Sequence, residues 1–189
     1  MSQDTFHEQL RVLIVGCSEK AASAYSQAAP EVLPLLSDEA ARRWVELGCS
    51  LAHASATAGV KYFRESPEVI LAFEERAAVQ PALEIGLRLA VRDYGIALEY
   101  FRQCPPVLPK IGMQGLQDWA QIAVVLASQS DTVGYGTAIE YLKGSPQVLD
   151  HLSLGDLSSW AQLGLMFALE DQKNKDFLAL EYFRVSPEL

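Results

Sequence analysis

The sequence predicts an all-α protein built from stacked helical repeats. Three observations support this prediction: a tyrosine motif that returns five times, an apolar stripe of helical period before each tyrosine, and no sustained alternation of strand type. Each tyrosine has a proline five residues later, in the pairs Tyr25 and Pro30, Tyr62 and Pro67, Tyr100 and Pro105, Tyr141 and Pro146, and Tyr182 and Pro187. Successive tyrosines are 37, 38, 41 and 41 residues apart.

Each repeat is expected to begin with a long amphipathic helix. The second copy reads Trp44-x-x-Leu47-Gly48-x-x-Leu51-Ala52, so apolar or small residues stand at offsets 0, 3, 4, 7 and 8 from the tryptophan. These offsets form one stripe of a helix. The small residue at offset 4 predicts a place where a neighbouring helix comes close, because a larger side chain there would hold the backbones apart.

The tyrosine motif is expected to form a second helix. Its tyrosine follows a small residue by one helical turn, so both lie on one face. We expect the aromatic residues to be buried core positions, with the tyrosine hydroxyl reaching the rim or a backbone carbonyl. These residues are Trp44, Trp119, Trp160, Tyr25, Tyr62, Tyr100, Tyr141 and Tyr182. After the motif, Ser66-Pro67-Glu68 predicts the capped start of a short third helix.

The repeats are predicted to form one domain, with boundaries at about 1–36, 37–74, 75–112, 113–153 and 154–189. A unit of about forty residues with two or three helices has the size of armadillo and HEAT repeats. Such units stack because they cannot bury their own apolar faces, so we predict a right-handed α-solenoid of about five repeats. A tetratricopeptide-like array is the alternative, but its period is only about 34 residues.

The first and last repeats differ from each other. In the first, His7, Arg11, Ser26 and Ala29 replace Trp, Gly, Phe and Ser, as expected of a capping unit whose outer face meets water. The last repeat carries an unworn tyrosine motif just before Leu189. We therefore expect either that the chain is a fragment of a longer protein or that another chain covers this end; a natural end with a frayed tail is the alternative.

Composition excludes several classes of function. The 189 residues carry a formal charge of −9, which argues against non-specific nucleic-acid binding. No apolar run reaches the roughly 20 residues that span a bilayer, and the N-terminus is unlike a signal peptide. Cys17, Cys49 and Cys104 are far apart and odd in number, so we expect reduced, mostly buried thiols in a cytoplasmic protein.

No motif indicates catalysis, a metal or a cofactor. His7, His53 and His151 lie in different repeats and lack ligand spacing, and acidic pairs such as Glu170-Asp171 are expected to be solvated. We therefore predict a protein-binding scaffold and not an enzyme. A helical-repeat enzyme of the lyase or hydrolase type, with its site in a groove, is the competing class. A structural or oligomerisation module is a third.

One row of cations follows the tyrosines. Arg64, Arg102, Lys143 and Arg184 each stand two residues after a tyrosine, and Gln27 takes this position in the first repeat. One interpretation is a cation near a helix C-terminus, favourable by ~0.3–1 kcal/mol and paired with acids such as Glu68 and Glu188. The other interpretation is a basic ridge that docks an acidic segment of a partner.

The combined pattern resembles the N-terminal helical repeats of bacterial von Willebrand factor A proteins that serve MoxR-type AAA+ ATPases. Nitric oxide reductase activation proteins and the adaptor subunit of one Rubisco activase type belong to this group. The matching residues are Trp44, Gly48, Ala52, Tyr62, Phe63, Arg64, Ser66 and Pro67, with their later copies. The resemblance implies an adaptor arm that links an ATPase to its client. The family's metal motif, Asp-x-Ser-x-Ser, is not matched, since Asp156-Leu157-Ser158-Ser159-Trp160 differs at its last position.

Overall fold

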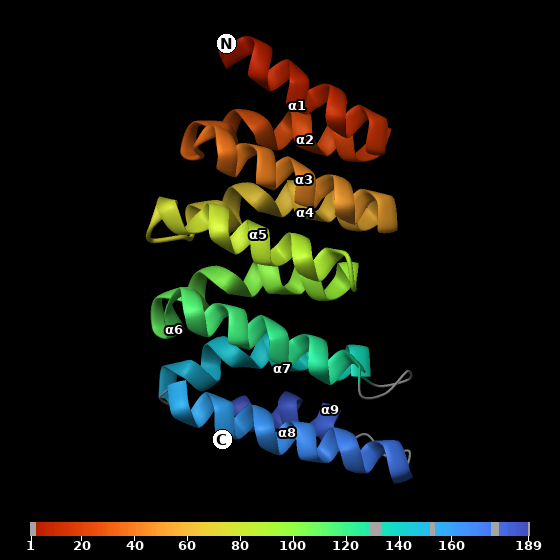
Figure 1. The fold of residues 1–189 in the computed structure, drawn as a ribbon, viewed down its shortest axis with the longest axis vertical. Helices are drawn as coiled ribbons and strands as arrows, with labels where there is room; N and C mark the ends of the chain where they lie inside the picture. Colours follow the sequence, from red (N-terminus) through yellow and green to blue (C-terminus); the bar gives the residue numbers. More distant parts are fainter. Residues whose placement is uncertain (1–2, 129–133, 152–153, 175–177, 189) are drawn as a thin grey trace. The chain divides into compact units, whose positions relative to one another are not determined.

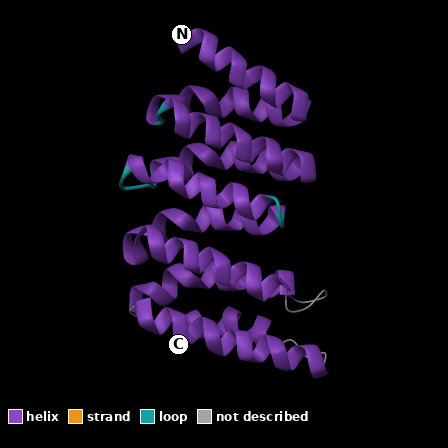
Figure 2. Ribbon diagram, viewed as in Figure 1, coloured by secondary structure: helices purple, strands orange, loops and turns teal. Residues whose placement is uncertain are grey.

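The computed structural model describes residues 3–128, 134–151, 154–174 and 178–188. Within these ranges all regular structure is helical and no strand occurs, which confirms the all-α prediction (Figure 2). The order along the chain (Figure 1) is α1 (Gln3–Cys17), α2 (Glu19–Val32), η1 (Leu33–Leu35), α3 (Asp38–Ala54), α4 (Ala56–Leu71), η2 (Arg76–Ala78), α5 (Val79–Ala90), α6 (Tyr94–Ser128), α7 (Gly134–His151), α8 (Leu154–Asn174), α9 (Leu178–Val185) and η3 (Ser186–Glu188).

The chain divides into two compact units, Met1–Pro105 and Pro106–Leu189, and the boundary between them falls inside α6. The same helix is interrupted at Gly112, whose backbone has φ 68° and ψ 177°. A positive φ of this size is in the left-handed region, which favours glycine over residues with a Cβ. Gly112 stands where the third predicted repeat ends and the fourth begins.

Packing inside each unit follows the repeats. In the first unit α1 packs against α2 and α3 against α4, while α1 also contacts α3, α3 contacts α5 and α2 contacts α4. First helices therefore lie on first helices, and second helices lie on second helices. In the second unit α7 packs against α8 and α9, which also contact each other. This arrangement buries the apolar stripes that the sequence shows.

The prediction of a separate short third helix after each tyrosine motif is wrong for four of the five repeats. Pro30, Pro67 and Pro146 lie inside α2, α4 and α7, and Pro105 lies inside α6, so in four repeats the second helix continues through its proline. Only the last copy begins a separate element at its Ser-Pro, the 3-10 helix η3. A proline inside a helix removes one backbone hydrogen bond. Ala29 and Cys104 precede Pro30 and Pro105, whereas a serine precedes Pro67 and Pro146.

That serine joins the two helices of its repeat. Ser66 Oγ donates to the carbonyl oxygen of Tyr62 at 2.7 Å, and it accepts a hydrogen bond from Trp44 Nε1 at 2.8 Å. The arrangement recurs in the second unit, where Trp119 Nε1 donates to Ser145 Oγ at 2.8 Å and Trp160 Nε1 donates to Ser186 Oγ at 2.7 Å. Every tryptophan of the chain therefore places its indole N–H on a helix serine.

The tyrosines tie the same helices together from the other side. Tyr62 Oη donates to the carbonyl oxygen of Trp44 at 3.1 Å, and Tyr100 Oη donates to that of Ala82 at 3.3 Å. Both acceptors stand at offset 0 of the first helix. Tyr141 Oη is buried without a hydrogen-bond partner in the described part of the chain. Burial raises the pKa of all three hydroxyls, which stay protonated and able to donate.

Three of the tyrosine rings, those of Tyr25, Tyr62 and Tyr141, also pack against the next repeat. The Tyr25 ring lies 5.3 Å from that of Trp44 and 5.7 Å from that of Phe63. In the second unit Tyr141 meets Trp160 at 5.5 Å and Phe183 at 5.4 Å. The aromatic positions are buried except that Tyr182, in the last repeat, is half-buried. A tyrosine on the aromatic residues of the following repeat is thus the common junction within both units.

The glycines at offset 4 leave space for an aromatic ring and not for a neighbouring helix backbone. A Cβ added to Gly48 would overlap the ring of Phe63, and one added to Gly164 would overlap that of Phe183. The close backbone approach lies elsewhere, because a Cβ at Gly59 would come within 2.9 Å of the Ala52 Cα. The prediction of a close helix approach at offset 4 is corrected accordingly.

Replacing the serine tests this packing. Ser66→Ala leaves the fully buried Trp44 N–H without an acceptor, so the free energy of unfolding should fall by about 1–3 kcal/mol in chemical denaturation. Ser26→Ala is the matched control, since Ser26 Oγ also donates to the carbonyl four residues before it, at 2.9 Å, but is exposed and receives no indole. Equal losses in the two variants would contradict the role of the indole bond.

Candidate interaction site in the first repeat

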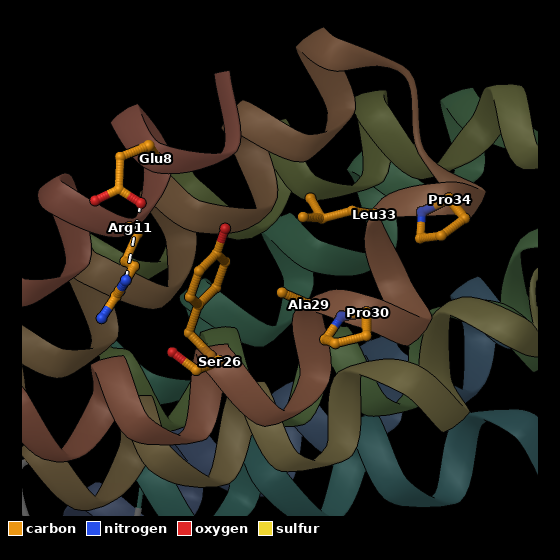
Figure 3. Close-up of a pocket in the computed structure, with 8 residues that line it drawn as sticks. Glu8, Arg11, Ser26, Ala29, Pro30, Leu33 and Pro34 are labelled. Carbon is orange, nitrogen blue, oxygen red and sulfur yellow. Dashed lines mark ion pairs between the residues drawn. The ribbon is translucent and has the colours of Figure 1, made fainter. Parts of the chain in front are cut away.

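A surface cleft of about 520 Å³ lies in the first unit, between α1, α2 and η1. Figure 3 shows seven of its residues with labels; Glu8 and Arg11 stand on one side, and Pro30, Leu33 and Pro34 on the other. The complete lining is Glu8, Arg11, Tyr25, Ser26, Ala29, Pro30, Leu33 and Pro34. We call this the first-repeat cleft.

The register of the repeats explains why the cleft exists. Arg11 and Ser26 stand 37 positions before Gly48 and Phe63, and in the second repeat the Phe63 ring lies over Gly48. That ring also packs edge-on against Trp44, with 5.2 Å between ring centroids. Serine in place of phenylalanine leaves this volume unfilled. His7 takes the tryptophan position, and its side chain lies outside the described part of the structure.

Polar groups surround an apolar floor in the cleft. Arg11 Nη1 and Glu8 Oε2 form an exposed ion pair at 3.8 Å (dashed in Figure 3). Burial, and secondarily the charge of Glu8, raises the pKa of Tyr25 to about 12, so its hydroxyl is neutral at physiological pH. Ala29 and Leu33 contribute apolar surface. The cleft therefore has charged and hydroxyl groups at its rim and an apolar floor.

Of the predicted cations, Arg102 is committed to the fold. Its Nε and Nη2 bind the two carboxylate oxygens of Glu65 at 2.7 and 2.8 Å, and its Nη1 binds Glu99 at 3.0 Å. Glu99 is buried and also accepts from Gln103 Nε2 at 2.9 Å. These bonds, Glu65 first, hold the pKa of Arg102 well above its usual value. Arg102 therefore links α4 to α6 through a bidentate pair.

The cations of the second unit pair with acids on their own helices. Lys143 Nζ lies 3.3 Å from Glu140, and Arg184 lies 3.3 Å from Glu181 and 3.9 Å from Glu140. The acid stands one residue before the tyrosine and the cation two residues after it, a spacing of one helical turn. None of these cations pairs with Glu68, and the side chain of Glu188 lies outside the described part of the structure.

The second repeat departs from this pairing. Lys61 takes the position of the acid, so Lys61 and Arg64 stand one turn apart on α4, and both are exposed. Neither forms an ion pair with any residue that the structure describes. The predicted cation row covers only the position two residues after each tyrosine, so it does not include Lys61. The position just before the tyrosine distinguishes the second repeat, because it reads Lys61, Glu99, Glu140 and Glu181 along the chain.

Other chemistry-bearing residues have structural surroundings. His53 and His151 are exposed, and no group of three or more metal-binding side chains occurs among the described residues. Asp171, expected to be solvated, is instead buried and accepts from the backbone N–H groups of Leu178 and Ala179 at 2.9 Å each, which starts α9. A buried cap of this kind needs a partner helix, which the sequence pattern alone does not reveal.

The three thiols are free, and two of them lie together. Cys17 Sγ and Cys49 Sγ approach the same acceptor, the Leu13 carbonyl oxygen, at 3.2 and 3.9 Å. Burial raises the pKa of Cys49, and the Cys17 thiol adds to the shift. Cys104 is fully buried beside the Tyr100 hydroxyl. The prediction of reduced and mostly buried cysteines agrees with these positions.

Comparison with known proteins gives no assignment. No protein-family model, no curated protein and no solved structure matches the chain. None of the described helices is both long enough and apolar enough to cross a membrane. The resemblance to adaptor proteins of MoxR-type ATPases therefore has only the repeat motif as its support.

The origin of the cleft is testable by restoring the missing ring. In an Arg11→Gly background, Ser26→Phe should raise the free energy of unfolding by about 1–2 kcal/mol, because a partly buried phenylalanine then fills the cleft. With Arg11 present, Ser26→Phe should give no gain in the free energy of unfolding. Arg11 stands at the position of Gly48, where even an added Cβ would overlap the Phe63 ring. Thermal denaturation of the natural chain, the two single variants and the double variant measures these free energies. Equal gains with and without Arg11→Gly would contradict the equivalence of Arg11 and Ser26 with Gly48 and Phe63.

Proposed function

We propose that this protein is a right-handed α-solenoid of five HEAT- or armadillo-like repeats that acts as a protein-binding scaffold in the cytoplasm. The observation that carries the proposal is the recurring junction, in which a tyrosine packs on the aromatic residues of the next repeat within each unit. A chain that stacks one repeated packing unit presents an extended surface on which a partner can bind. We propose the specific form of an adaptor arm between a MoxR-type AAA+ ATPase and its client.

The exposed groups left over after packing favour binding over catalysis. Most chemistry-bearing side chains discussed above have a partner inside the fold: Arg102 in its carboxylate pairs, Asp171 in its cap and the Tyr62 and Tyr100 hydroxyls in their carbonyl bonds. Lys61 and Arg64 are the exception on α4, two adjacent cations open to solvent. Such a pair suits an acidic segment of a partner, which it would attract from a distance and orient.

Of the four cations in the predicted basic ridge, we retain only Arg64, in the second repeat, as a candidate binding residue. Arg102 is held by two carboxylates, and reversing its charge would leave Glu99 buried beside like charges. A loss of binding in that variant would not be separable from a loss of fold. Lys61 and Arg64 can be reversed at no such cost, because neither contributes an ion pair within the described structure.

The test is the affinity of the chain for a purified MoxR-type ATPase in the presence of ATP, measured by biolayer interferometry. The double reversal Lys61→Glu and Arg64→Glu should weaken binding about tenfold or more, mainly through slower association. Arg42→Glu with Arg92→Glu is the control: both residues are exposed, neither forms an ion pair with a residue that the structure describes, and the change in net charge is the same. No binding by the natural chain would refute the adaptor form, and equal losses in both doubles would refute the site.

A further inference from the structure

Two of the three free thiols meet where α1 packs on α3. Cys17 Sγ donates to the Leu13 carbonyl oxygen at 3.2 Å, and Cys49 Sγ reaches the same oxygen from α3 at 3.9 Å. After burial, a hydrogen bond between the two thiols is the next cause of the raised pKa of Cys49. The third thiol, Cys104, is fully buried beside Tyr100 Oη. Cys17 and Cys49 are called the α1–α3 thiol pair.

The two thiols of the pair differ in their access to solvent. Cys49 is only 7% exposed, whereas Cys17, at the C-terminal end of α1, is partly exposed. The positions equivalent to Cys17 in the second and third repeats are Ala54 and Arg92, and both are exposed. Exposure at this helix end is therefore common to the first three repeats and does not depend on Cys17 being in the first. A small solute reaches the Cys17 sulfur before it reaches that of Cys49.

The packing of first helices on one another does not itself require these sulfur atoms. At the next junction of this kind, between α3 and α5, the positions of Cys17 and Cys49 are taken by Ala54 and Leu87. Aliphatic side chains are thus sufficient to build the contact. The thiol pair adds to the α1–α3 junction a chemistry that the α3–α5 junction lacks.

We infer that Cys17 and Cys49 are a site of reversible oxidation, at which hydrogen peroxide forms a disulfide that joins α1 to α3. Disulfides of this transient kind are the ones that reducing compartments permit. The site is separate from the proposed partner-binding cations Lys61 and Arg64 and does not depend on them.

The reaction takes two steps, and Cys17 reacts first because it is the accessible thiol. The Cys17 sulfur attacks one peroxide oxygen, so that an S–O bond forms, the O–O bond breaks and the departing oxygen leaves as water, giving a sulfenic acid. The Cys49 sulfur then attacks the Cys17 sulfur. The S–S bond forms, the S–O bond breaks, and the hydroxide leaves as water with the Cys49 proton. Two thiols thus lose two electrons and two protons, and one peroxide becomes two waters. A small thiol reductant restores both cysteines by exchange.

The experiment is hydrogen peroxide treatment of the native full chain, followed by alkylation in denaturant, tryptic digestion without reductant and mass spectrometry. Trypsin releases Cys17 in residues 12–20, Cys49 in residues 44–61 and Cys104 in residues 103–110. The first two peptides should be joined by a disulfide that dithiothreitol separates, and Cys104 should be recovered as the alkylated thiol. Oxidation of Cys17 to sulfinic acid without the cross-link, or a disulfide only between Cys17 residues of two copies, would overturn the inference.

Single variants separate the roles of the two thiols. Cys49→Ala should stop the reaction at the Cys17 sulfenic acid, which dimedone traps. Cys17→Ser should leave Cys49 as the thiol under the same treatment, and Cys104→Ala is the control that should still form the disulfide. Oxidation of Cys49 in the Cys17→Ser variant as fast as the natural pair reacts would contradict the order of the two steps.

A urea titration tests whether the site is already formed in the native structure. The oxidised chain should unfold at a higher urea concentration than the reduced chain, because the cross-link restricts the unfolded state. Peroxide-treated Cys17→Ser is the control for oxidation elsewhere and should show no such shift. An equal or lower midpoint for the oxidised natural chain would show that the bond forms only by disturbing the packing of α1 on α3, and would overturn the inference. Failure of the ATPase-binding test would leave all these results unaffected.

Discussion

The buried indole N–H is the shared constraint of the three repeats that carry a tryptophan. A tryptophan in the core supplies a large apolar surface, but its N–H needs an acceptor once water is excluded. In both units that acceptor is a serine on the second helix, whose hydroxyl is itself held by the tyrosine carbonyl four residues earlier. The bond joins the two helices of each repeat that carries a tryptophan. In the third repeat, where Ala82 and Cys104 take these positions, Tyr100 Oη bonds the first helix without it.

Much of this fold could be predicted from the sequence because it rests on periodicity. The helical stripes, the recurrence of the tyrosine and the burial of the aromatic positions all follow from spacing. The Ser-Pro step could not be predicted in the same way. Locally, Ser66 and Pro67 have the chemistry of a helix start, and the alternative partner for the serine is an indole 22 residues away. In the second and fourth repeats the second helix continues through its proline, whereas at Ser186 the same indole bond accompanies the start of η3, so the bond alone does not decide whether the helix continues.

The candidate site shows the same limit. The worn residues Arg11 and Ser26 were visible as departures from the repeat, and the cleft lies where they stand. That these residues leave an open volume follows only from the structure, in which the Phe63 ring lies over Gly48 in the second repeat. The cation row was likewise visible, but its pairing was not, since Arg102 finds Glu65 37 residues away. Arg102, Lys143 and Arg184 each have a glutamate just before the tyrosine of their own repeat as a partner. Arg64 does not, because Lys61 takes that position in the second repeat.

The most direct measurement of the central claim is hydrogen exchange at the indole N–H groups by NMR. The chain has three tryptophans, so its spectrum holds three indole signals that report Trp44, Trp119 and Trp160 separately. If each indole is bonded to its serine, all three should exchange far more slowly than free tryptophan, and Ser145→Ala should accelerate and shift only the Trp119 signal. Rapid exchange of the natural indoles, or an unchanged Trp119 signal in that variant, would contradict the account.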